Sequence, residues 1–224
     1  MLPVLRLCED ILSNEAVVEL PLCPRMIFVV HGAVTIAGRT MIDGEARYGD
    51  GPLPLVAGKQ GATLWRWELV PHGSGDGALD GPGIASRNKI SASLETMPRG
   101  DLLWRGDSVG FPPGGCAYLH RHQGPGIRCL IEGGIRIDTH GRSTSYGPGG
   151  AWFESGPDPV FAQAAADRPS RFIRVMILPR ALMGQSSIEY LNDEDRGKPR
   201  SQQYQVLVDA PLTLAPADSI SSHA

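Results

Sequence analysis

Two histidines separated by one residue, His120 and His122, are the side chains best placed to do chemistry. They end a stretch beginning at Cys116 that reads as a strand, and alternate side chains of a strand lie on one face. The two imidazoles can therefore bind one ion together, since neutral imidazole is a common ligand of divalent transition metals. Nearby histidines are also frequent on exposed strands, so the pair needs further ligands to define a metal site.

Three other residues could complete such a site, and each has a simpler alternative. Glu154, if enclosed among apolar strands, must be paired with a cation or neutralised, so it is a candidate third ligand or general base; otherwise it is a solvated carboxylate at the rim. Gln163 could offer its amide oxygen to a metal or only make hydrogen bonds. Arg128 alternates with Gly126 and Leu130. Facing inward, it could hold a substrate carboxylate through two hydrogen bonds; facing outward, it is a surface charge.

The segments that carry these residues belong to a duplicated pattern. Each copy has an apolar strand, a glycine turn and an alternating strand, then a glycine-led segment, and finally a strand that ends in proline. The matched pairs are residues 28–36 with 129–137, residues 48–58 with 146–156, and residues 64–71 with 172–179. The sequence therefore predicts two homologous modules of roughly seventy residues each. With 28 glycines and 19 prolines to punctuate short strands, the fold class is all-β.

Four divisions of the chain follow from this pattern. They are a degenerate first module, a glycine-rich linker, a second module that carries the histidine pair, and a C-terminal extension. Their expected bounds are residues 1–71, 72–88, 89–179 and 180–224.

The C-terminal extension contains two expected elements and a tail. Residues 181–190 could form a short helix, and residues 204–209 alternate as a strand. We expect that strand to pair with a barrel edge, because an uncovered edge offers unpaired backbone groups to other chains. The last ten or so residues are rich in Ala, Ser, Pro and Asp, and we expect them to be disordered.

Two stretches of the second module resemble the conserved motifs of the cupin superfamily. The stretch from Gly114 to Gly133 combines a Pro-Pro-Gly-Gly turn, the histidine pair, a Gly/Pro loop and an apolar strand ending in Glu-Gly, like the first motif. The stretch from Tyr146 to Pro159 is similar to the second. With the repeat, the resemblance covers most of residues 15–179. It implies a bicupin: two jelly-roll (double-stranded β-helix) barrels, with the site inside the second.

The resemblance also implies a ligand set. Cupins usually bind a divalent metal through two histidines and a Glu or Gln of the first motif, and a histidine of the second. His120 and His122 match the first two. Gly126 stands at the Glu/Gln position and no histidine lies near Pro159. We therefore expect Glu154 or Gln163 to complete the shell around a divalent ion, with Fe, Mn, Ni and Zn all compatible.

Several functions fit these residues. The first is a metal-dependent enzyme of the dioxygenase type, or an isomerase or lyase in which Glu154 moves a proton and Arg128 holds a small carboxylate or keto compound. The second is a non-catalytic cupin that only binds a small molecule. The third is an oligomeric scaffold in which both pockets are degenerate. In the first module, Glu19 and Pro21 stand where the histidines should be, so we expect a structural role there, packing on the second module or in a dimer.

Composition restricts the partners. The formal net charge of −3 gives no electrostatic reason to bind nucleic acid or an anionic membrane, which leaves a small molecule and a second copy, as a homodimer, as the expected partners. The N-terminus has an acidic pair where a secretory peptide is basic, and no apolar run approaches eighteen residues, so we expect a cytoplasmic protein. The four cysteines are widely spaced, and we expect them to be reduced.

Overall fold

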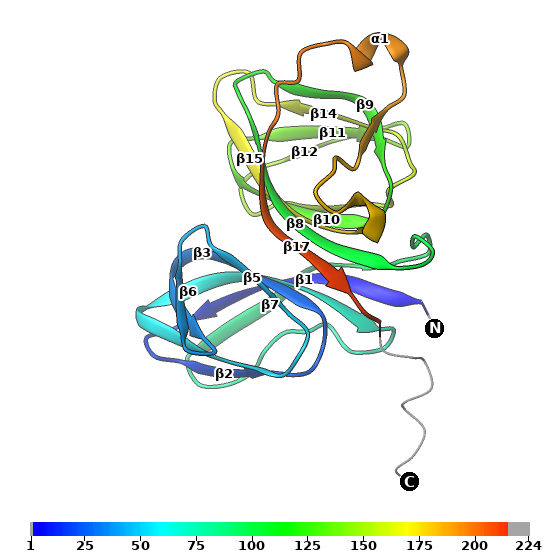
Figure 1. The fold of residues 1–224 in the computed structure, drawn as a ribbon. Coiled ribbons are helices and arrows are strands. Elements are labelled where there is room, and N and C mark those ends of the chain that lie inside the picture. Colours follow the sequence, from blue (N-terminus) through cyan, green and yellow to red (C-terminus); the bar gives the residue numbers. More distant parts are fainter. Residues whose placement is uncertain (1, 215–224) are drawn as a thin grey trace.

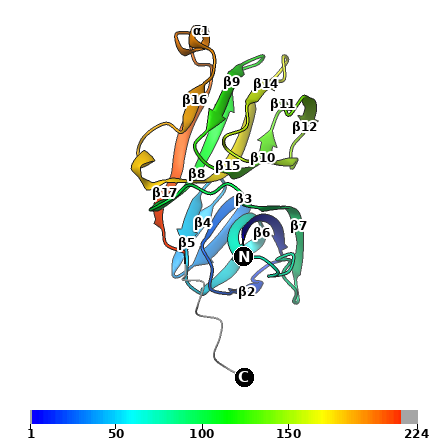
Figure 2. The same cartoon turned by 90° about the vertical axis from the view of Figure 1, so that its right-hand side faces the viewer.

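The computed structural model describes residues 2–214, which form seventeen strands, one short α-helix and one 3-10 turn (Figure 1). The strands make three antiparallel sheets, and the chain divides into two β modules stacked one on the other, which the view in Figure 2 also shows. The all-β prediction with two tandem modules is confirmed. No helix in the described residues is long and apolar enough to cross a membrane.

The first module is one sheet that folds over on itself. Its strand order is β4-β3-β6-β1-β7, with β2 also paired to β6 and β5 to β3. The long strands β3 and β6 bend where Gly32, with a positive φ of 89°, meets Gly61; a Cβ on Gly32 would collide with the Gly61 carbonyl. The strands are β1 (Pro3–Leu12), β2 (Val17–Leu20), β3 (Arg25–Ile36), β4 (Arg39–Ile42), β5 (Ala46–Gly49), β6 (Leu53–Pro71) and β7 (Ile84–Ser93).

The second module is a sandwich of two five-stranded sheets. One has the order β13-β10-β15-β8-β17 and the other β12-β11-β14-β9-β16. The strands are β8 (Leu102–Phe111), β9 (Cys116–His122), β10 (Gly126–Glu132), β11 (Ile135–Thr139), β12 (Arg142–Tyr146), β13 (Ala151–Glu154), β14 (Val160–Ala164), β15 (Ser170–Pro179), β16 (Ile188–Tyr190) and β17 (Gln203–Leu212).

Each module ends with a strand that returns to its own first strand. β7 pairs antiparallel with β1, and β17 pairs in the same way with β8. Residues 84–88, expected in the linker, thus already belong to a strand of the first module. We name the connections that lead to these strands, residues 72–83 and 180–202, the first and second return segments. The strand predicted over residues 204–209 is confirmed as β17.

The second return segment differs from the helix that residues 181–190 suggest. It contains a 3-10 turn (Arg180–Leu182), β16, and helix α1 (Asp193–Arg196). β16 pairs with β9, and this backbone pairing overrides the local helical pattern. The predicted disordered tail, the last ten or so residues, falls on residues 215–224, outside the described part of the chain.

Three of the four hydrophobic clusters in the described residues organise these sheets. One fills the inside of each module, and the third lies between them, where the sheet containing β1, β3 and β6 faces the sheet containing β8, β10 and β15. Along β6, Trp65, Trp67 and Leu69 face the other module while the intervening side chains face inward. The Trp67 indole also donates a hydrogen bond to the Ile127 carbonyl across the interface, at 3.2 Å. The first module therefore packs on the second through a shared core.

Replacing Trp67 with alanine tests this shared core. Trp67 is fully buried, and we expect Trp67→Ala to lower the free energy of unfolding by about 3–5 kcal/mol, as other large-to-small changes in cores do. Chemical denaturation followed by circular dichroism should show one cooperative transition shifted as a whole. Leu22→Ala, at a side chain 73% exposed, is the control and should change stability by less than about 0.5 kcal/mol. Two separate transitions, only one of them shifted, would contradict a shared core.

Candidate metal centre

His120, His122 and Glu154 meet inside the second module. The histidines lie on β9 of one sheet and Glu154 at the end of β13 in the other, so the cluster bridges the two sheets. Their potential ligand atoms all lie within 4.8 Å of one another, and all three residues are buried. In residues 2–214 this is the one group of three or more His, Cys, Asp or Glu side chains with such geometry. The structure thus brings together three of the residues proposed from the sequence.

A bulge in β9 sets the direction of His120. His120 is paired with Val160 and Ala117 with Ala162, so β9 has one residue more than β14 between these pairs. Strict alternation would put Tyr118 beside His120 in the interior. Instead, its ring lies under the Lys198 ammonium, 4.7 Å from the ring centroid, and is not part of the cavity wall. The Tyr118 carbonyl is left to accept a hydrogen bond from His120 Nδ1, at 2.7 Å.

Both imidazoles have a partner on Nδ1, which leaves Nε2 free. His122 Nδ1 lies 3.3 Å from the Ser187 hydroxyl, contributed by the second return segment, while His122 Nε2 lies 3.7 Å from Glu154 Oε2. Burial lowers the pKa of His120 below its ordinary value and that of His122 well below it. The rings are therefore neutral at neutral pH, with an Nε2 lone pair available, which is the form that binds a metal.

Glu154 stands directly across from the position where cupins carry their Glu or Gln ligand. It is the backbone partner of Gly126 on the neighbouring strand β10. Its Oε1 accepts a hydrogen bond from the Trp152 indole at 2.8 Å, and its Oε2 lies 2.7 Å from Nη2 of Arg128. Those last two atoms are in ionic contact, but neither has a well-directed hydrogen-bond partner.

Arg128 faces inward, as one of the two sequence alternatives had it. It is 1% exposed, and its Nη1 donates a hydrogen bond to the Gly126 carbonyl at 2.7 Å. Burial lowers its pKa to about 10, against the opposing effect of Glu154, so it is a cation at neutral pH. The second buried guanidinium of the cavity, Arg174, has Asp107 as a partner of its own, with two hydrogen bonds of 2.6 and 3.0 Å.

The space between these groups is small. It leaves about 20 Å³ for the centre of a water-sized sphere, which is enough for about one water or one ion. Trp152, Phe172 and Ile188 contribute its apolar wall, and Tyr204 reaches it from β17. A single ion fits this cavity as it stands, whereas an organic molecule requires the wall to move.

The structure does not bring Gln163 to this cluster. On β14 the residues Val160, Ala162 and Ala164 face the interior, so Gln163 faces the opposite way. Its amide donates hydrogen bonds to the carbonyls of Gly114 and Gly115, at 2.7 and 3.3 Å. A hydrogen-bonding role, the alternative left open by the sequence, fits this position.

Sequence reasoning missed the contribution of the second return segment. Ser187 touches His122, and Tyr190 on β16 packs its ring 6.4 Å from that of His120. Neither residue lies in a recognisable motif. The one available signal is length: the second return segment is much longer than the first, and its additional residues cover the barrel end where the histidines lie.

No family model matches the sequence, and no curated protein matches it significantly. Solved structures do match. The oxalate decarboxylase of Bacillus subtilis aligns at a TM-score of 0.57 and 14% identity, over 87% of this chain and 73% of that one. AerE from Microcystis aeruginosa aligns at 0.56 and 10% identity, over 80% and 89% of the two chains. A cupin 2 conserved barrel domain protein from Leptotrichia buccalis aligns at 0.47 and 11% identity, over 79% and 84%. The alignment with oxalate decarboxylase, together with the two antiparallel β modules, shows that the chain has the cupin fold.

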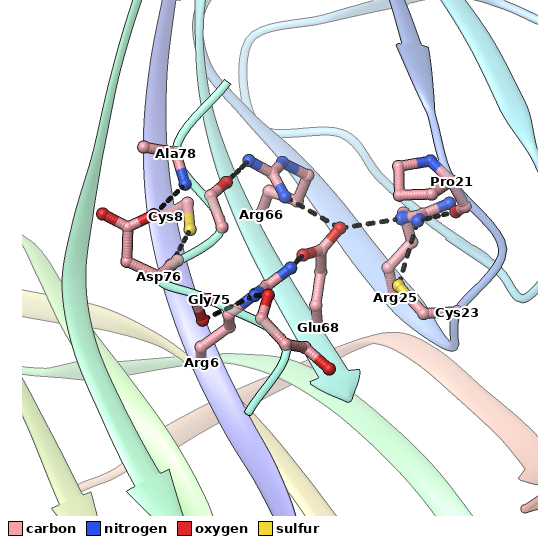
Figure 3. A network of polar contacts seen from close by, with 12 residues as sticks. Arg6, Cys8, Pro21, Cys23, Arg25, Arg66, Glu68, Gly75, Asp76 and Ala78 are labelled. Carbon is pink, nitrogen blue, oxygen red and sulfur yellow. Dashed lines mark hydrogen bonds and ion pairs between the residues drawn. The ribbon is translucent and has the colours of Figure 1, made fainter. Parts of the chain in front are cut away.

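The first cupin module has an ion network where the second has its cavity (Figure 3). Glu68, fully buried, makes contacts with three guanidiniums: Arg6 at 2.6 Å, Arg66 at 2.7 Å and Arg25 at 3.1 Å. Arg66 also bonds Asp10 at 2.8 Å. Backbone carbonyls of the first return segment, at residues 74, 75 and 77, accept the remaining donors of Arg6 and Arg66. The part of the first module that corresponds to the cavity of the second is thus occupied by its own charged side chains, and a structural role for this module stays a prediction.

The Glu68 carboxylate should make stability depend on pH. Burial alone would raise its pKa, but Arg66 and Arg6 outweigh burial and lower it to about 2, from 4.5. A lowered carboxyl pKa contributes stability above the unfolded-state value, and this contribution is lost as the pH falls. We expect Glu68→Gln to cost about 3 kcal/mol at pH 7, with the difference from wild type shrinking between pH 4.5 and 2. Urea unfolding at a series of pH values measures this.

The control is a carboxylate in a solvent-exposed ion pair. Glu132, whose side chain is 55% exposed, pairs with Arg171. Glu132→Gln should cost less than about 0.5 kcal/mol at every pH. A constant difference between Glu68→Gln and wild type down to pH 2 would show that the Glu68 charge is not what the three arginines stabilise.

Proposed function

We propose that the second module is a divalent-metal centre that acts on a small organic acid. The observation that carries the proposal is the geometry of His120, His122 and Glu154: three buried ligands on two facing sheets, with both imidazoles bonded through Nδ1 and a carboxylate oxygen that has no well-directed hydrogen bond. Two neutral imidazoles and one carboxylate are a donor set that divalent transition metals accept.

The donor set also suggests the kind of chemistry. A divalent ion held by two histidines and one carboxylate keeps open positions and can act as a Lewis acid or in O₂ chemistry when bound. Fe, Mn, Ni and Zn all suit the ligands; one structural neighbour, the Bacillus subtilis oxalate decarboxylase, is described as having Mn(II) centres, which favours testing Mn first. A dioxygenase-type reaction stays our first hypothesis, with isomerase or lyase chemistry second.

Within this proposal Arg128 and Glu154 have separate roles. The Arg128 guanidinium would hold the acid group of the substrate, since it is buried and its Nη2 has no well-directed acceptor. Glu154 would be a metal ligand, and a role as general base requires the oxygen that the metal does not use. We further propose that the protein is a bicupin and that each return segment belongs to its own module. We also propose that it acts in the cytoplasm as a homodimer and does not bind nucleic acid; these last points rest on the sequence alone.

A non-catalytic binding protein is the second candidate. It is favoured by the ligand set, which lacks two of the four usual cupin ligands at Gly126 and near Pro159, and by the small cavity. The two candidates differ in their response to chelation. Binding of a small acid that survives removal of all metal favours the second, and consumption of O₂ or of the acid by metal-loaded protein favours the first.

Metal analysis is the direct test of the site. We expect the purified protein, once loaded with Mn²⁺ or Zn²⁺ and desalted, to retain about one ion per chain. Inductively coupled plasma mass spectrometry measures the metal content. A His120→Ala, His122→Ala double variant should retain none, because a lone carboxylate holds such ions weakly. The matched control changes two other histidines, His31 and His140, both largely exposed, and should keep the metal. Wild type and double variant holding equal amounts would overturn the proposed centre.

A further inference from the structure

In the cavity, one carboxylate would have two cations as partners, the metal and Arg128. Glu154 is the third ligand of the proposed centre and also the counter-ion of Arg128. Arg174 is different, since Asp107 neutralises it independently of the cluster. Arg128 is therefore the guanidinium of the cavity that would lose its counter-ion, Glu154, to a bound metal.

Gly126 lies beside this arginine, at the position that the cupin resemblance assigns to a Glu or Gln ligand. A Cβ placed there would collide with the Val175 carbonyl oxygen and would lie 2.8 Å from the Met176 side chain and 3.1 Å from Arg128 Nη1, so the closest obstacle is the backbone of β15. The Gly126 carbonyl also accepts a hydrogen bond from Arg128. Glycine at residue 126 therefore lets β10 lie close to the β15 backbone, and it also leaves the Arg128 guanidinium its place in the cavity.

The charges show what a metal would do here. With both histidines neutral, Arg128 and Arg174 balance Glu154 and Asp107, so the buried groups sum to zero. A divalent ion would raise the summed charge of the buried groups to +2. It would also weaken the ionic contact between Glu154 and Arg128, because the carboxylate would bind the ion. Buried charges are stable only when they are paired, so the loaded cavity has a deficit of negative charge next to Arg128 Nη2.

We propose that Arg128 couples metal binding to anion binding. When Glu154 turns to the metal, the Arg128 guanidinium is released to bind a small carboxylate, which also lies against the ion. Metal and anion then bind cooperatively. Because the cavity has room for about one water or one ion, the anion must be small and the wall must move to admit it beside the metal. This inference rests on the proposed metal centre.

The coupling can be measured without any reaction. The probe is formate. If formate acted only by binding free metal ions in solution, it would lower the apparent affinity of the protein for the metal, which is the opposite of the expected effect. Isothermal titration of apo-protein with Mn²⁺, or Zn²⁺ against a competing chelator, gives the Kd with and without formate. We expect formate to tighten metal binding by about tenfold, and metal to tighten formate binding by the same factor, since coupling is reciprocal.

Variants assign the effect to Arg128. Arg128→Gln should bind metal at least as tightly as wild type, because Glu154 loses its competitor, and should show no formate effect. Arg121→Gln is the matched control: its guanidinium lies on the outside of β9, paired with Glu189, and the formate effect should persist. Circular dichroism checks the fold of each variant, and the wild-type measurement needs no variant.

The failures are distinguishable. If wild type binds no metal, the proposed centre is wrong and the coupling falls with it. If wild type binds metal but formate changes its Kd by less than twofold, or if Arg128→Gln keeps the full formate effect, the centre stands and the coupling role of Arg128 is overturned.

Discussion

Charges enclosed between two sheets must be neutralised where they lie, and both modules are organised around this constraint. In each, an arginine on the strand beside the module's first strand pairs with an aspartate on that first strand: Arg66 on β6 with Asp10 on β1, and Arg174 on β15 with Asp107 on β8. The modules diverge two residues later. Glu68 in the first gathers three arginines, whereas the matched residue of the second, Met176, is apolar and leaves room for the histidines.

Much of the architecture could be predicted from the sequence because it depends on local periodicity. The three matched segment pairs give the two modules, and period-two alternation places His120 and His122 on one face. The same alternation leaves the direction of Arg128 open, and the structure places it inside. Glu154 could be proposed because a carboxylate between apolar residues needs a cation. These are properties of single strands, and they can be recognised without knowing which strands pair with one another.

The sequence-based predictions are wrong or incomplete where pairing with a neighbouring strand determines which way a side chain points or whether a segment forms a strand. The bulge in β9 is set by its register with β14, which no local pattern reveals, and it turns Tyr118 out of the cavity. Gln163 points outward because its strand is phased by Ala162 and Ala164, which are buried. Residues 84–88 and 188–190 are polar or mixed in character and become strands only by pairing with β1 and β9.

The core shared by the two modules has a consequence for how the protein holds its shape. The apolar sheet of the second module, exposed by itself, would need a second molecule to cover it, and such an association weakens on dilution. Here the covering sheet is carried in the same chain, so its effective concentration is fixed by the connection from β7 to β8 and does not vary with expression level. The first module is suited to that task because its buried charges are paired with one another inside it.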